Sequence, residues 1–122
     1  MAKSFRQERL NESIKELLSE LLINEVKDPR IGLVTITSVN VAQDLTSAKV
    51  YFSVMGSDDA RDDTRKGLES AQAYLRKKIG RELKLRSAPE LRFVYDDSLD
   101  RSMAIEEALK AAKLKDGEDQ GK

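Results

Sequence analysis

The chain has 122 residues, enough for one domain with a single core, and it contains neither cysteine nor histidine. Disulfides, thiolate metal sites and thiol nucleophiles are therefore excluded, as is the side chain most often used for proton transfer near neutral pH. Basic and acidic residues balance at 22 each, so the net charge gives no steering towards nucleic acid. No apolar run approaches the ~20 residues of a membrane span or the apolar stretch of a signal peptide. These features predict a cytoplasmic protein with no membrane, small-molecule or cofactor partner.

The first predicted element is an amphipathic helix of about six turns near the N-terminus. Its apolar residues recur at helical spacing and are Leu10, Ile14, Leu17, Leu18, Leu21 and Leu22. Pro29 is expected to end this helix, because the residue before a proline is pushed out of the helical region. Gly32 then lies in the exit loop.

Residues 33–55 alternate between apolar and polar side chains, the period of half-buried strands. A short turn over residues 43–46 separates two such runs, so they are predicted to pair as an antiparallel hairpin. The apolar phase slips between Ile36 and Val39, which predicts a β-bulge near Ser38.

The second half of the chain begins with Gly56 and an acidic segment, residues 57–63, predicted as a loop that runs into a helix. That helix carries an apolar stripe made of Leu68, Ala71, Leu75, Ile79 and Leu83. Pro89 blocks its continuation, and the alternation over residues 91–96 predicts a third strand.

A last helix is predicted after Asp97 or Ser98, either of which could cap it. Its apolar residues are Met103, Ile105, Ala108, Leu109 and Ala112. The apolar patterning from Leu10 to Leu109 predicts that this segment supplies nearly the whole core. Residues 1–112 are therefore expected to form one domain, and the charged residues 113–122 a disordered tail.

The segment from Arg76 to Arg92 is strongly basic, with seven basic residues and two acidic ones. Lys77, Arg81 and Lys84 recur at i, i+4 and i+7, opposite the apolar stripe. An ordinary solvated helix face is the competing interpretation. Like charges at this spacing repel one another, however, and the positive run continues beyond the helix, which favours a polyanionic partner such as a phosphate backbone.

The candidate phosphate-binding residues are Arg76, Lys77, Lys78, Arg81, Lys84 and Arg86, with Lys3, Arg6, Arg9 and Arg30 as helpers. Arg92 could belong either to this basic surface or to the third strand. Whether the helpers join the same surface is not decided by periodicity. The aspartates at positions 96, 97 and 100 lack EF-hand spacing, so they are predicted to cap a helix and not to bind a metal. A hydrolase or nuclease would rest on these aspartates alone, and the sequence predicts no enzyme.

Two segments carry a resemblance to a known family. Residues 28–37 read DPRIGLVTIT, and residues 85–98 read LRSAPELRFVYDDS. Together with DL at 44–45 and AKVYFS at 48–53, these signatures resemble ribosome-binding factor A from Phe5 to Leu109. The resemblance implies an α+β, type II KH-like fold in the order helix-strand-strand-helix-helix-strand, with a kink between the second and third helices and a further C-terminal helix.

The resemblance also implies a function. It implies a monomeric factor that binds immature 30S subunits through 16S rRNA and assists late maturation and 5′-end processing of that RNA. The family is associated with growth in the cold, and its members are expected to leave before the subunit enters translation. A protein-interaction module that docks on a ribosomal protein or an assembly GTPase, with incidental RNA contact, is the alternative.

The family's interhelical kink is built on Ala-x-Gly, where ordinary KH domains have a Gly-x-x-Gly loop. Ala71-Gln72-Ala73 aligns with this kink, so alanine replaces the family's glycine here. Because alanine is the better helix former and lacks glycine's freedom at positive φ, a shallower kink, or one maintained by packing alone, is expected.

Overall fold

The computed structural model describes residues 5–120 and contains four helices and a three-stranded sheet within them. In chain order the elements are α1 (Phe5–Asn24), β1 (Val34–Val41), β2 (Ser47–Val54), α2 (Asp58–Ser70), α3 (Gln72–Glu82), β3 (Glu90–Tyr95) and α4 (Ser98–Gln120). The predicted α+β class and the predicted order of the elements are confirmed.

The hairpin and its bulge form where the alternation predicts them. Strands β1 and β2 pair in antiparallel fashion, and their register shifts between Ile36 and Ser38. The turn is closed by a hydrogen bond of 2.8 Å from the Ala42 amide to the Ser47 carbonyl, and Leu45 adopts a positive φ of 63° within it. The bulge keeps Ile36 and Val39 on the same face of the sheet, where both are buried.

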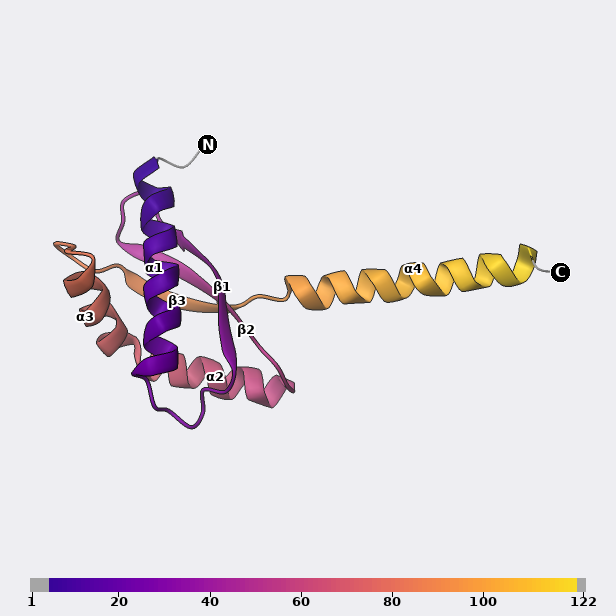
Figure 1. Cartoon of the computed structure of the whole chain (residues 1–122), viewed down its shortest axis with the longest axis horizontal. Helices are drawn as coiled ribbons and strands as arrows, with labels where there is room; N and C mark the ends of the chain where they lie inside the picture. The colour runs from indigo at the N-terminus through magenta and orange to yellow at the C-terminus, as the bar shows by residue number, and fades with distance from the viewer. Residues whose placement is uncertain (1–4, 121–122) are drawn as a thin grey trace.

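The sheet has the order β1-β2-β3, and β3 runs parallel to β2. A parallel pair needs a long crossover connection, which α2 and α3 supply here. Helices α1, α2 and α3 lie together against the sheet, while α4 projects away from the rest of the molecule (Figure 1). The alternate, outward residues of the strands, such as Asn40, Lys49 and Arg92, are exposed.

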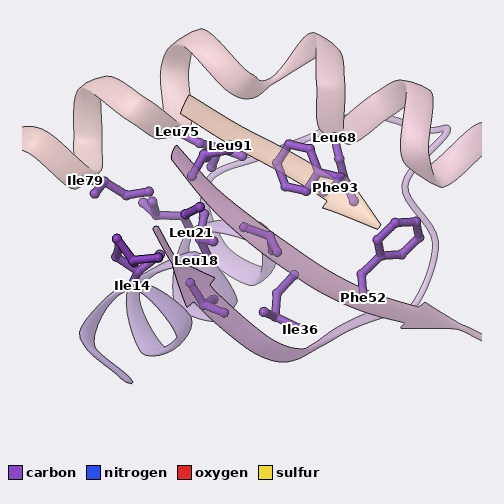
Figure 2. Packing of buried hydrophobic residues seen from close by; sticks show 14 of the residues in the cluster. Ile14, Leu18, Leu21, Ile36, Phe52, Leu68, Leu75, Ile79, Leu91 and Phe93 are labelled. Atoms are coloured by element: carbon purple, nitrogen blue, oxygen red, sulfur yellow. The ribbon is translucent and has the colours of Figure 1, made fainter. Parts of the chain in front are cut away.

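The core lies between the three helices and the inner face of the sheet (Figure 2). Its fully buried side chains include Ile14 and Leu18 from α1, Phe52 from β2, and Leu75 and Ile79 from α3. Because successive residues of each helix stripe are three or four apart, one stripe per helix reaches this interior.

Two buried polar side chains join the start of α1 to the edge strand β1. The Asn11 Oδ1 atom accepts a hydrogen bond of 2.8 Å from the Val41 amide, and the Gln7 amide nitrogen donates one of 3.2 Å to the Val41 carbonyl. Both side chains are only 8% exposed. They satisfy two backbone groups that a strand at the edge of a sheet would otherwise leave unpaired in the interior.

Asn11→Ala is expected to lower the free energy of unfolding by about 2 kcal/mol, because it leaves the buried Val41 amide without an acceptor. Urea unfolding followed by circular dichroism measures this change. Glu12→Ala, at the exposed neighbouring position, is the control and should leave stability within about 0.5 kcal/mol of wild type. Equal stability of the two variants would contradict the assigned role.

Two predicted boundaries were wrong. Helix α1 ends at Asn24 and not at Pro29, because the amides of Glu25 and Val26 both bond to the Leu21 carbonyl and close the helix early. The acidic segment is not a loop, since α2 begins at Asp58. Ser57 caps this helix by accepting a hydrogen bond from the Ala60 amide, and aspartates in the first turn suit the helix dipole.

The core lies within the predicted segment, but the described side chains of α4 are outside it. Met103, Ile105 and Leu109 are 51–60% exposed, because α4 leaves the end of β3, and none of the α4 side chains that the structure describes belongs to the core cluster. The helix continues through residues 113–120. A helix without packing partners is marginal in water, so the division at residue 112 into a domain and a disordered tail stays a prediction.

Candidate nucleic-acid interface

The outward side of α3 is cationic. Leu75 and Ile79 are fully buried on its inner side, whereas Lys77 and Arg81 are exposed on the other. Lys84 follows directly after the helix and is exposed as well. We call Lys77, Arg81 and Lys84 the basic face of α3. None of them forms an ion pair with any side chain that the structure describes.

Lys84 stands in a backbone conformation that normally selects glycine. Its φ is 54°, in the left-handed region. The Leu85 amide bonds to the Gly80 carbonyl at 2.9 Å and the Lys84 amide to the Arg81 carbonyl at 3.3 Å, which makes a Schellman motif at the end of α3. A lysine in this position costs stability that glycine would not.

Lys84→Gly is therefore expected to raise the free energy of unfolding by about 1 kcal/mol while it weakens RNA binding severalfold through the lost charge. Thermal unfolding and a fluorescence-anisotropy titration with RNA measure the two effects. Lys84→Asn, which tolerates the left-handed region and also lacks the charge, should weaken binding equally. If Lys84→Gly gained stability and lost no affinity for RNA, Lys84 would not be part of the interface.

Arg76 and Lys78 differ from the basic face because intramolecular contacts engage them. The half-buried Arg76 guanidinium donates hydrogen bonds of 3.1 Å and 3.0 Å to the carbonyls of Pro89 and Ala88. Lys78 lies 3.7 Å from the carboxylate of Glu25 at the end of α1. That these two residues bind RNA stays a prediction, whereas the structure shows their contacts within the protein.

Glu25 also accepts a hydrogen bond of 2.7 Å from the Tyr74 hydroxyl, and this bond is the main reason that the pKa of Tyr74 is raised. The Lys78 ammonium lies 5.7 Å from the centre of the same tyrosine ring. Tyr74, Lys78 and Glu25 therefore join α3 to the end of α1. No sequence pattern indicated this cluster, because residues 25 and 74 are far apart in the chain.

Arg6 and Arg9 do join the end of α3. They line a surface hollow of about 340 Å³, together with Phe5, Leu10, Ser13 and Leu85. We call this the α1–α3 hollow. Helix α3 runs back alongside α1, so the N-terminal turns of α1 lie near the loop that follows α3 (Figure 1). Lys84 and Arg86, both exposed, precede and follow the lining residue Leu85 in the chain.

Arg30 does not join this surface. It follows the opposite end of α1, a helix of 20 residues and so about 30 Å long. Its guanidinium pairs with Asp28 at 2.7 Å, and hydrogen bonds from Arg30 lower the pKa of the Asp28 carboxyl to about 2. The loop packs against α2, where a Cβ on Gly67 would lie 2.6 Å from Ile31. Lys3 lies outside the described residues.

Arg92 belongs to the strand. It is exposed on the uncovered face of the sheet, in register with Lys49 of β2, and thus on the face opposite the helices.

The break between α2 and α3 falls at Ala71, whose backbone is close to helical with φ −84° and ψ −4°. No positive φ is needed there, which suits the alanines of the aligned Ala71-Gln72-Ala73 segment.

The aspartates near residue 96 make local contacts. Asp96 accepts hydrogen bonds from the Ser98 amide at 2.9 Å and the Thr37 hydroxyl at 2.6 Å, and its bond to the Ser98 hydroxyl is the main cause of its lowered pKa. No group of three or more acidic side chains in the described part of the chain is arranged to hold a metal ion. Of the helices as far as they are described, none is both long and apolar enough to cross a membrane.

Comparison with known proteins gives consistent matches. The family model for ribosome-binding factor A matches residues 6–109. Ribosome-binding factor A from Geobacter sulfurreducens is 46% identical over 93% of this chain and 97% of its own length. The solution structure of a Thermotoga maritima protein, described as a candidate ribosome binding factor A, is 34% identical, with a TM-score of 0.70 over 80% of this chain and 93% of that one.

A third match has the same fold at lower identity. It is a homology model of the Thermus thermophilus ribosome binding factor A, fitted into a cryo-EM map of a 30S complex of that protein. It is 22% identical to this chain, with a TM-score of 0.57 over 79% of this chain and 97% of the other.

Proposed function

This chain belongs to the ribosome-binding factor A family, and we propose that it binds immature 30S subunits through 16S rRNA and assists late maturation and 5′-end processing of that RNA. The Thermus thermophilus family member has been fitted into a map of its 30S complex, which supports the same partner for this chain. A ribosome-bound factor of this kind acts in the cytoplasm, as a monomer on the free subunit.

One observation carries the proposal, namely the basic face of α3. Like charges at i and i+4 destabilise a helix slightly unless an anion neutralises them, and no described carboxylate does so here. Exposed cations in a row follow the spacing of a phosphate backbone without reading base sequence. Structured RNA is the polyanion that this surface suits.

The proposal is tested by deleting the gene for this chain and complementing with wild-type protein or with the charge-reversed variant described in the Discussion. Wild type should sediment with free 30S subunits and restore mature 5′ ends of 16S rRNA, most clearly at low temperature. Cells complemented with the variant should accumulate precursor 16S rRNA. Normal 5′ ends in the deletion strain would contradict the processing role.

Docking on a ribosomal protein or an assembly GTPase is the second candidate function, and the exposed apolar side chains of α4 favour it. Ile105 and Leu109 are each 60% exposed and lie one turn apart. Nuclease treatment of a lysate before sedimentation separates the two candidates, since a complex held by protein contacts survives loss of the accessible RNA.

We also propose that the chain acts by binding and not by catalysis. The chain contains no histidine or cysteine. The Asp96 carboxylate accepts hydrogen bonds from Thr37 and from Ser98 at the start of α4. Incubating the purified chain with precursor 16S rRNA and magnesium should leave the RNA intact. Cleavage at a defined position would refute this part of the proposal.

A further inference from the structure

We infer that the α1–α3 hollow holds one unpaired nucleotide of the bound RNA, with its base stacked against Phe5 and its phosphates beside Arg6 and Arg9. This inference rests on the proposed function and names the RNA feature that the site takes. It would make the interface selective for RNA with a single-stranded segment next to a helix.

The hollow combines an apolar floor with a cationic rim. Leu10 of α1 and Leu85 after α3 are partly buried and pack against the core, whereas Arg6 and Arg9 are exposed. A nucleotide has the complementary composition, a planar base that gains from apolar contact and a phosphate that pairs with a guanidinium.

Phe5 is the aromatic side chain of α1. It is 74% exposed, and the guanidinium carbon of Arg9 lies 5.6 Å from the centre of its ring. Aromatic rings and guanidinium planes are the two surfaces on which proteins stack unpaired bases. Here both occur one helical turn apart at the edge of a hollow of about 340 Å³.

The position of the hollow connects it to the basic face of α3. Leu85 lines the hollow, and the exposed cations Lys84 and Arg86 precede and follow it in the chain. An RNA strand that crosses the basic face of α3 therefore reaches the hollow next to Lys84, because the lining residue Leu85 directly follows it in the chain. Asn11 and Gln7 bond to Val41 and hold this end of α1 in place.

The test uses the full chain and two RNA probes of equal length, a blunt hairpin and a hairpin with a five-nucleotide 3′ overhang carrying 2-aminopurine. Wild type should bind the overhang probe more tightly and quench the 2-aminopurine fluorescence through stacking. Phe5→Ala should reduce affinity for the overhang probe roughly tenfold and abolish quenching. Its affinity for the blunt hairpin and the salt slope should stay unchanged, because no charge is lost.

Ile23→Ala is the matched control, since Ile23 is an equally exposed apolar residue, at 77%, near the other end of the same helix. It should bind both probes like wild type. Arg9→Lys, which keeps the charge but lacks the planar group, should retain the salt slope and lose part of the quenching.

Equal behaviour of Phe5→Ala and Ile23→Ala on the overhang probe would overturn the inference. If the chain still bound the blunt hairpin in a salt-dependent manner, the proposed function would stand without a nucleotide site in the hollow. If it bound neither probe at any salt concentration, the inference and the RNA-binding function would fall together.

Discussion

Replacing Lys77, Arg81 and Lys84 together by glutamate is expected to weaken binding to 16S rRNA by on the order of a hundredfold or more at physiological salt. If about five phosphates are contacted, the logarithm of the affinity should fall with the logarithm of the salt concentration with a slope of roughly −4 for wild type. The variant loses three of these contacts and adds repulsion, so its slope should be close to −1. All three side chains are exposed, so the fold should tolerate the change.

The measurement is a filter-binding or anisotropy titration at several salt concentrations. A triple replacement of Lys49, Lys66 and Lys110 by glutamate is the matched control, because these lysines are exposed on β2, α2 and α4 and the net charge changes equally. This control should keep most of the affinity. If both variants lost affinity alike, overall charge and not the basic face of α3 would govern binding.

Sequence periodicity predicted well what depends on local pattern. The slip in the apolar phase located the bulge near Ser38, and the spacing of Leu75 and Ile79 identified the buried side of α3. The exposed positions of Lys77 and Arg81 followed from the same spacing, because a helix fixes the angle between residues two to four apart.

Which distant residues come into contact depends on the tertiary fold, and the sequence pattern did not predict these contacts. Arg6 and Arg30 looked equivalent as helpers, but α1 separates them by most of its length. The bonds from Asn11 and Gln7 to Val41 were not foreseen, because buried amides carry no periodic signal of their own. Phe5 could have been noticed as an aromatic residue beside two arginines, although only the structure brings Leu85 to it.

The largest effect on stability is expected when Arg76 is replaced. This residue was predicted to bind RNA because of its charge alone. Its guanidinium bonds two carbonyls, those of Ala88 and Pro89, just before β3, and thereby ties α3 to the start of that strand. Hydrogen bonds from charged groups contribute more than neutral ones. Arg76→Ala should therefore lower the free energy of unfolding by about 3 kcal/mol and the melting temperature by roughly 10–20 °C.

Comparison with the adjacent lysine separates the structural role from the binding role. Lys77→Ala should leave the melting temperature within a few degrees of wild type and reduce RNA affinity, whereas folded Arg76→Ala protein should keep most of its affinity at low temperature. Arg76→Lys keeps the charge but not the two-pronged donor, so it should recover little of the lost stability. If Arg76→Ala instead melted like wild type and bound RNA poorly, the guanidinium would be acting on phosphate. Two neighbouring cations of one helix are therefore expected to differ in role, because the Arg76 guanidinium bonds the loop that leads into β3.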